Sequence, residues 1–164
     1  MGVLKGRSGL IWLVLSIVLL ALDQITKWVV STEMSLYQTI DILPVFNFTY
    51  VHNYGAAFSF LSEAGGWQKY FFSTIAVTIS VLLIYWLKKL PATNKLLCSA
   101  YALVLAGAIG NLIDRLVHGY VIDFLHVYYQ QYDFPVFNIA DVAISIGAAL
   151  LLLDAFFEQK ESDK

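Results

Sequence analysis

Charged residues are scarce in this chain. Asp, Glu, Lys and Arg make up 13% of its 164 residues, whereas about a quarter is usual in a water-soluble domain. Apolar residues make up 59%, and the mean hydropathy is +0.71. Most of such a surface must face something other than water. The composition therefore excludes a soluble globular protein and indicates an integral membrane protein.

Cysteine and the usual metal motifs are also scarce. Cys98 is the only cysteine, so an internal disulfide is excluded, and a cysteine metal site would need several thiolates. There is no H-E-x-x-H zinc motif and no G-x-S-x-G nucleophile motif, and His52, His118 and His126 lack zinc-ligand spacing. We expect no metal ion, no cofactor and no nucleic-acid partner. Without repeats or linkers, we expect one domain over residues 1–164, present as a monomer.

Four apolar stretches are long enough to cross a bilayer, whose hydrocarbon core of roughly 30 Å needs about 20 helical residues. They are residues 9–31, 68–87, 96–116 and 135–157. The first also resembles a secretory signal peptide. However, its apolar run resumes through "ITKWVV", and "ALD" is a poor cleavage site. The sequence therefore predicts four retained membrane-spanning helices.

Positive charges are distributed unevenly around these spans. The connections 28–68 and 116–138 contain no Lys or Arg. The charges that flank the other span ends are Lys5, Arg7, Lys88, Lys89, Lys95, Lys160 and Lys164. Because positive residues favour the cytoplasmic side, both termini are predicted to be cytoplasmic and both long connections to lie outside.

The first outer connection, residues 32–67, is too long for a simple linker. Phe46, Phe48 and Tyr50 alternate with Asn47 and Thr49, which is the period-two pattern of a strand bounded by Pro44 and by His52-Asn53. "EAGGW" at 63–67 is typical of a turn into the second span. We expect a small sheet at the outer membrane surface.

Small residues recur within two of the spans. Ala102, Ala106 and Gly110 are four apart in the third span, as are Ala143 and Gly147 in the fourth. Small side chains let membrane helices approach closely, so these residues predict helix–helix contact.

Several polar residues remain inside the spans, where an ionisable group costs about 2.5–3.5 kcal/mol on insertion scales. Asp23 and Lys27 are four apart and can pair on one helix face. Asn111 and Arg115, and then Asn138 and Asp141, form similar pairs near the outer ends of the third and fourth spans. With Asn53 from the outer connection, they predict a polar cluster at one depth.

Four acids are candidates for chemistry in this cluster: Asp114, Asp123, Asp133 and Asp141. Asp133 precedes "FP" in a sequence typical of an exposed turn and fits a solvated or capping role, and Asp154 lies near the predicted cytoplasmic end. Residue chemistry alone places Asp141 first and Asp123 second. Two close carboxylates share a proton, so that one can act as base and the other as acid in amide hydrolysis.

Five sequence blocks resemble the signal peptidase II family, the bacterial lipoprotein signal peptidases. They are "LDQITK" at 22–27, "NYGAAFSFL" at 53–61, "AGAIGNLIDRL" at 106–116, "VIDF" at 121–124 and "FNIAD" at 137–141. Their order, spacing and four-span context match the family over about residues 11–153. Ala106 stands where many members have Gly, a departure for which we expect no functional effect.

The resemblance implies a fold and an activity. The fold would be an all-α integral membrane bundle of four transmembrane helices, with a small β-sheet cradle on the outer, periplasmic face. The activity would be that of an aspartic endopeptidase with Asp123 and Asp141 as its dyad. It would act in the bacterial inner membrane near the periplasmic leaflet. The substrate would be a diacylglyceryl-modified prolipoprotein, cut before the lipidated cysteine.

The resemblance also implies binding residues and further partners. The matching substrate-binding and supporting residues are Asp23, Lys27, Asn53, Gly55, Asn111, Arg115, Asn138 and Ala140. Ala140 matches a position where a larger side chain would crowd the dyad. Membrane lipid, entering sideways between helices, and globomycin-type cyclic peptide inhibitors are expected partners.

Two other classes of protein remain as alternatives. A small proton- or ion-coupled transporter would also carry intramembrane Asp, Lys and Arg. Against it, the acids gather at one depth, and the two halves of the chain show no repeat. A structural assembly factor would not need this polar cluster. Cleavage of a lipidated precursor without an ion gradient discriminates the peptidase from both.

Overall fold

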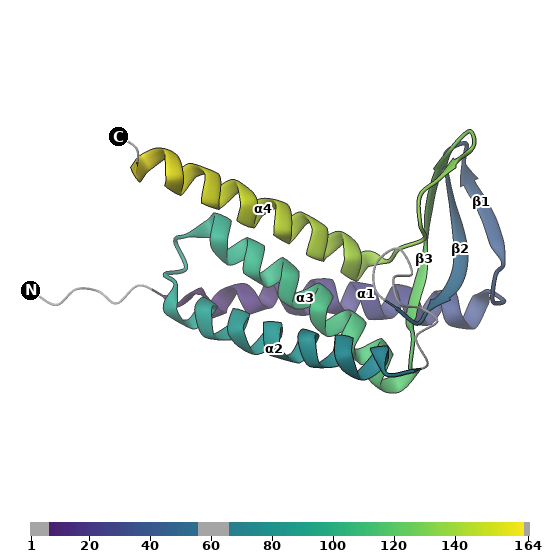
Figure 1. The fold of residues 1–164 in the computed structure, drawn as a ribbon, viewed down its shortest axis with the longest axis horizontal. Helices are drawn as coiled ribbons and strands as arrows, with labels where there is room; N and C mark the ends of the chain where they lie inside the picture. Colours follow the sequence, from purple (N-terminus) through teal and green to yellow (C-terminus); the bar gives the residue numbers. More distant parts are fainter. Residues whose placement is uncertain (1–6, 56–65, 163–164) are drawn as a thin grey trace, which may run out of the picture.

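Four long helices run side by side in the computed structural model, which describes residues 7–55 and 66–162, with side chains up to Phe157 (Figure 1). Their bounds are α1 Leu13–Glu33, α2 Gln68–Lys89, α3 Lys95–Val117 and α4 Ile139–Ser162. A short 3-10 helix, η1 Gly9–Trp12, leads into α1. All four helices are long and apolar enough to cross a membrane, which confirms the four predicted spans.

The fourth helix begins at Ile139, four residues later than the sequence predicted. Pro135 disfavours helical backbone at the residue before it. Phe137 then pairs with Leu125 as an extended residue, through Phe137 N–H to Leu125 O at 3.0 Å and Leu125 N–H to Phe137 O at 2.8 Å. Asn138 caps the helix, since its Oδ1 accepts the Asp141 N–H at 2.9 Å. The segment before α4 therefore belongs to the sheet end of the molecule.

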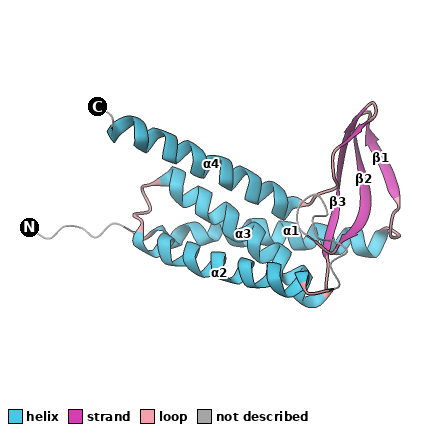
Figure 2. Ribbon diagram, in the orientation of Figure 1, coloured by secondary structure: helices cyan, strands magenta, loops and turns pink. Residues whose placement is uncertain are grey.

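A four-stranded antiparallel sheet stands at one end of the bundle (Figure 2). Its strands are β1 Thr39–Leu43, β2 Phe46–Asn53, β3 Val121–Tyr129 and β4 Tyr132–Asp133, in the order β1-β2-β3-β4. The strand expected after Pro44 is confirmed as β2, and it continues through Asn53. The β3 and β4 strands were not predicted, so the second outer connection contributes half of the sheet.

The register of β2 against β3 brings two distant parts of the sequence together. Val51 pairs with Asp123, and Asn53 pairs with Val121. An irregularity between Phe48 and Val51 shifts this register. A bulge increases local twist and redirects side chains. As a result, the end of β2 lies beside Asp123.

The opposite end of the bundle holds the α2–α3 turn and the end of α4 (Figure 1). The start of the described chain lies there too, because Ala92 N–H donates to Arg7 O and Gly9 N–H donates to Leu90 O, both at 2.8 Å. The two long connections thus share one end of the molecule, as the four-span arrangement predicts.

Helix α3 packs against each of the other three helices. Ala102 and Ala106 are buried in these contacts, as expected from the small-residue pattern. A Cβ on Gly107 would collide with the Ala140 carbonyl, and one on Gly147 would lie 2.6 Å from Val104 Cγ2. Glycine therefore permits the close approach of α3 and α4.

Candidate active site

Asp123 lies on β3 with 1% of its surface exposed. Two amides donate hydrogen bonds to its carboxyl group. The Asn53 Nδ2 lies 2.9 Å from Asp123 Oδ2, and the Asn138 Nδ2 lies 2.6 Å from Asp123 Oδ1. The β2–β3 register places the first amide, and the cap of α4 places the second.

Asp141 lies in the first turn of α4 and is half-buried. It forms a reciprocal capping arrangement with Asn138, whose N–H donates to Asp141 Oδ2 at 3.3 Å while Asn138 Oδ1 accepts the Asp141 N–H. Asn111 Nδ2 donates to Asp141 Oδ1 at 2.8 Å. Asn138 therefore contacts both carboxyl groups, one through its side chain and one through its backbone.

The Asp123 carboxyl group has an unusual proton affinity. Burial, followed by the charge of Asp141, raises the pKa of Asp123 to about 7. Hydrogen bonds from Asn53 and Asn138, and the charge of Lys27, act in the lowering direction. Near neutral pH, Asp123 can therefore hold a proton beside Asp141, which is the arrangement that acid–base chemistry on an amide requires.

Lys27 links the polar residues of α1 and α3 beneath the two carboxyl groups. Its ammonium lies 2.9 Å from Asp23 Oδ2, 2.9 Å from Asp114 Oδ2 and 3.0 Å from Asn111 Oδ1. The expected Asp23–Lys27 pair is therefore present, and both side chains are only 2% exposed. Lys27 holds Asn111, which in turn holds Asp141.

Asp114 and Gln24 complete this support. Asp114 was one of the four candidate acids, and Gln24 was not predicted to contribute. Asp114 Oδ2 accepts the N–H of Ile122 at 3.1 Å, which fixes β3 next to Asp123. Gln24 Nε2 donates to Asp114 Oδ1 at 3.0 Å. The signal for Gln24 was its place beside Asp23 in "LDQITK".

Arg115 and Gly55 lie together, as the resemblance implies for two residues of one site. Arg115 Nη2 donates to the Gly55 carbonyl at 2.9 Å, and Nη1 donates to the Asn111 carbonyl at 3.3 Å. The guanidinium carbon also lies 5.3 Å from the centre of the Phe72 ring. The rest of "NYGAAFSFL" and the first part of "EAGGW" lie outside the described residues.

Ala140 lies next to Asp141 and contacts both α1 and α3. Its N–H donates to Asp23 Oδ1 at 2.9 Å, and a Cβ on Gly110 would lie 3.3 Å from the Ala140 Cβ. The methyl group therefore packs against α3. Helix packing gives a direct physical reason for a small side chain here.

Asp133, His126 and His52 contact partners other than the two carboxyl groups. The Asp133 side chain is 76% exposed and lies 3.6 Å from His126 Nε2. His52 shares a hydrogen bond with the Tyr50 hydroxyl at 2.8 Å and stacks on Tyr120. Among the residues that the structure describes, no group of three or more His, Cys, Asp or Glu side chains is arranged to hold a metal ion.

Two cavities reach Asp141 from different sides. The first has a volume of about 300 Å³ and is lined by Asn53, Phe134, Pro135, Val136, Phe137, Asp141, Val142, Ser145 and Ile146. The second has a volume of about 420 Å³ and is lined by Phe72, Ile75, Ala76, Ile79, Val104, Ala108, Asn111, Arg115, Asp141, Ile144 and Ser145. Both are mainly apolar, with polar groups gathered around Asp141, as expected of a site for an amphipathic ligand.

Known proteins similar to this chain share one activity in their names. A lipoprotein signal peptidase from Pseudoalteromonas translucida is 64% identical over 156 residues, covering 95% of this chain and 94% of the relative. One from Acinetobacter baumannii (strain SDF) is 55% identical over 156 residues, covering 95% and 89%. A bacterial membrane enzyme solved by the in meso method at 2.3 Å resolution superposes with a TM-score of 0.82. It is 33% identical in sequence, covering 93% of this chain and 91% of that one.

The family model described as "Signal peptidase (SPase) II" matches residues 15–157. The match includes both outer connections, all of α2 and α3, and both buried carboxyl groups. Together with relatives of this similarity over nearly the whole length, it shows that the chain belongs to the signal peptidase II family.

Proposed function

We propose that this chain is an aspartic endopeptidase in which Asp123 and Asp141 are the catalytic acid and base. The observation that carries the proposal is the contact of one residue, Asn138, with both carboxyl groups. A pKa of about 7 for Asp123 supports the assignment of the proton to that residue. An aspartic mechanism needs one protonated and one ionised carboxyl group at the same time.

As a member of the signal peptidase II family, the chain cleaves signal peptides from lipoprotein precursors in a bacterial membrane. Nothing in the comparisons supports the transporter alternative. We extend this to a diacylglyceryl-modified prolipoprotein cut immediately before its lipidated cysteine. The two apolar cavities that meet at Asp141 support an acylated substrate, because apolar chains can lie on either side of a polar reaction centre.

The proposed reaction divides the proton transfers between the two acids. Asp141 accepts a proton from water, and the resulting nucleophile attacks the carbonyl carbon of the scissile peptide bond. Asp123 donates its proton to the carbonyl oxygen as the tetrahedral intermediate forms. The C–N bond then breaks, and the leaving amine of the cysteine takes the proton held by Asp141. Asp123 recovers its proton when the new carboxylic acid carbonyl re-forms.

The neighbouring polar residues position these groups. Asn111 and Asn138 hold the two carboxyl groups, while Lys27 and Asp23 support Asn111 and the α4 backbone. Asn53, Gly55 and Arg115 would orient the substrate backbone, and a globomycin-type cyclic peptide would compete for the same contacts. We further propose one domain, a monomer, cytoplasmic termini and a site near the periplasmic leaflet of the inner membrane.

Replacement of either acid tests the dyad. Asp123→Asn and Asp141→Asn keep the size and much of the hydrogen bonding but remove the proton-transfer group. General acid–base catalysis contributes about 10²–10⁴-fold, and residues that act as a unit lose nearly everything together. Each variant should fall to background cleavage of a diacylglyceryl-modified precursor, while a cyclic peptide inhibitor still binds.

Asp133→Asn and Asp154→Asn are matched controls that should keep most activity. Asp133 is exposed on β4, and Asp154 lies far along α4 from Asp141. Substantial turnover by purified, folded Asp141→Asn protein would show that the wrong carboxyl groups have been paired. So would complete loss in folded Asp133→Asn protein.

A further inference from the structure

A third cavity lies between α2 and α3 and includes neither proposed catalytic residue. It has a volume of about 300 Å³ and is lined by Lys69, Tyr70, Ser73, Thr74, Val77, Thr78, Leu112 and Leu116. The second cavity, which reaches Asp141, is lined by other residues of α2, namely Phe72, Ile75, Ala76 and Ile79. Helix α2 therefore separates this third cavity from the site of peptide cleavage.

The side chains of α2 change character in a regular order along this cavity. Lys69, Ser73 and Val77 are four residues apart, so each lies about 6 Å further along the helix axis. The order runs from a cation near the sheet end, through a hydroxyl, to an apolar side chain facing Leu112. A glycerophospholipid has its phosphate, ester carbonyl and acyl chain in the same order over similar distances.

The Ser73 hydroxyl differs from the two threonine hydroxyls that line the same cavity. Thr74 and Thr78 donate to the carbonyls of Tyr70 and Thr74, each at 2.8 Å. Ser73 is 9% exposed, and its Oγ has no hydrogen-bond partner within residues 7–55 and 66–157. A buried polar group without a partner is destabilising. Ser73 thus has a donor available for a ligand in the cavity.

Lys69 also lies in a place that favours a bound anion. It is in the first turn of α2, where the helix dipole is unfavourable for a cation. Two carbonyls near the end of α3 already accept backbone bonds, since Asp114 O accepts the His118 N–H and Arg115 O accepts the Gly119 N–H. Over the described part of the chain, the Lys69 ammonium has no ion pair or hydrogen bond. A phosphate would complement its charge.

We propose that this cavity binds one membrane phospholipid. Its phosphate contacts the Lys69 ammonium, an ester carbonyl accepts a hydrogen bond from Ser73, and an acyl chain lies along Val77 and Leu112. The phosphate distinguishes this ligand from a diacylglyceryl substrate, which has none. The inference does not depend on which carboxyl groups catalyse cleavage.

Native mass spectrometry of the purified protein in detergent tests the proposal, with palmitoyl-oleoyl phosphatidylglycerol and the diacylglycerol of the same chains as probes. We expect one phosphatidylglycerol to be retained more tightly than diacylglycerol. Lys69→Gln should raise the dissociation constant about tenfold and Ser73→Ala about threefold, as expected for charged and neutral hydrogen bonds. Val77→Trp should abolish retention by filling the cavity without changing its charge.

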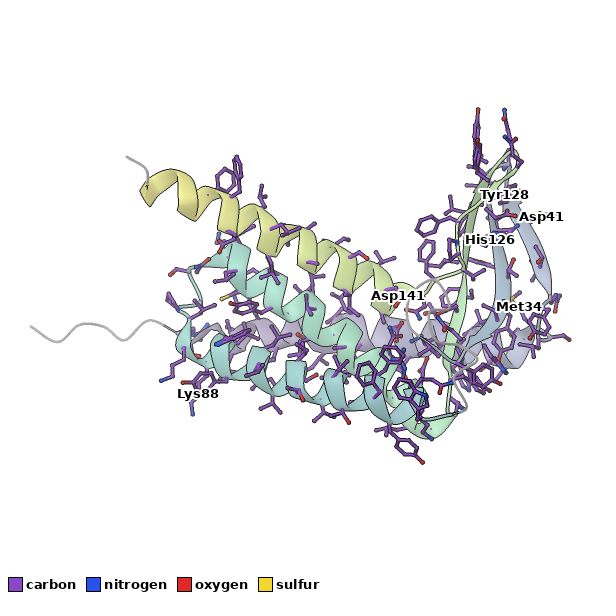
Figure 3. The ribbon with its side chains drawn as sticks, in the orientation of Figure 1. Met34, Asp41, Lys88, His126, Tyr128 and Asp141 are labelled. Carbon is purple, nitrogen blue, oxygen red and sulfur yellow. The ribbon has the colours of Figure 1, made fainter. Side chains whose placement is uncertain are left out.

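Lys88→Gln is the control, because Lys88 lies at the end of the bundle opposite Asp141 (Figure 3). Its phospholipid affinity should equal that of the unmodified chain. Equal affinity for diacylglycerol, an unchanged affinity in Lys69→Gln, or an equal loss in Lys88→Gln would each overturn the proposal. The melting temperature of every variant shows whether weaker lipid binding comes from unfolding. We expect Lys69→Gln to melt like the unmodified chain, so that its lower affinity reports on the lost lysine alone.

Discussion

Neutral amides make the direct contacts to the carboxyl groups of Asp123 and Asp141. Asn53 and Asn138 donate to Asp123, and Asn111 donates to Asp141. Lys27, whose charge acts to lower the pKa of Asp123, contacts Asp23 and Asp114 instead. An opposite charge in direct contact can lower a carboxyl pKa by 1–3 units. Because Lys27 does not contact the Asp123 carboxyl group directly, the pKa of Asp123 stays at about 7, and Asp123 can serve as an acid near neutral pH.

The first residue-scale prediction concerns the alkaline side of the pH profile. Because the pKa of Asp123 is raised to about 7, its proton is lost as pH rises through that value, and activity should fall there. Asn53→Ala removes a hydrogen bond that lowers this pKa. The alkaline limb should therefore move to higher pH by about one unit. The measurement is kcat/KM of precursor cleavage as a function of pH.

Asn47→Ala is the control for Asn53→Ala. Asn47 lies on the same strand but accepts from Thr49 and interacts with His126, so its replacement should leave the limb in place. A limb that stays fixed or moves to lower pH in Asn53→Ala would contradict the assignment of the proton to Asp123.

The raised pKa of Asp123 also makes the free energy of unfolding depend on pH. Its stabilisation is fully present below about pH 4 and is lost as pH rises through about 7.

The second residue-scale prediction concerns Lys27. Lys27→Met leaves the buried carboxyl groups of Asp23 and Asp114 without their shared cation. Breaking a buried ion pair from one side typically costs about 3–5 kcal/mol. We expect a large fall in thermal stability in detergent, partly restored by adding Asp23→Asn. Lys89→Met, at an exposed position, should melt like the unmodified protein. Equal melting of Lys27→Met and the unmodified protein would disprove the supporting role.

At the scale of elements, hydropathy predicts the helices well because each span must bury its backbone polar groups within itself. The strand β2 is also predictable, since Phe46, Phe48 and Tyr50 alternate with polar residues. The strand β3 was missed although "VIDFLHVYY" is rich in β-branched and aromatic residues. It follows α3 with only His118, Gly119 and Tyr120 between them.

The polar contacts were only partly predictable, because they depend on how each helix is rotated. Spacing placed Asp23 beside Lys27 and Asn138 beside Asp141 within single helices. Spacing within one helix does not predict the contact of Lys27 on α1 with Asp114 on α3, or the hydrogen bond from Gln24 to the same carboxylate. The contact of the Ala140 methyl group with α3 was likewise not predictable, because it depends on how α3 and α4 pack. Roles assigned to these residues remain predictions.

The close packing of α3 and α4 gives the element-scale prediction. Gly107→Ala places a methyl group against the Ala140 carbonyl and forces apart the helices that carry Asn111 and Asp141. Overpacking of this kind costs about 1–3 kcal/mol, so we expect lower melting temperature and lower cleavage activity together. Ala148→Val, at an exposed position on α4, should change neither. Full activity and stability in Gly107→Ala would show that the packing tolerates a wider separation.

At the scale of the whole molecule, the polar site lies at the end opposite a group of basic residues formed by Arg7, Lys88 and Lys89. The sheet and Asp141 lie at one end, and Lys88 lies at the other (Figure 3). Arg7 O accepts the Ala92 N–H, so Arg7 lies beside the turn that follows Lys88 and Lys89. A membrane with its anionic, cytoplasmic surface at this end would attract these cations. The substrate would then meet the dyad at the outer surface.

Cysteine labelling in intact spheroplasts tests this orientation. Tyr132→Cys is on the sheet at a site 70% exposed, and Thr93→Cys is in the exposed α2–α3 turn. An impermeant maleimide should label the first and not the second, while both should react after detergent lysis. The native Cys98 is buried, so it should react only after denaturation and serves as an internal check. Labelling of Thr93→Cys but not Tyr132→Cys in intact spheroplasts would reverse the proposed topology, and would place the sheet and both carboxyl groups on the cytoplasmic side.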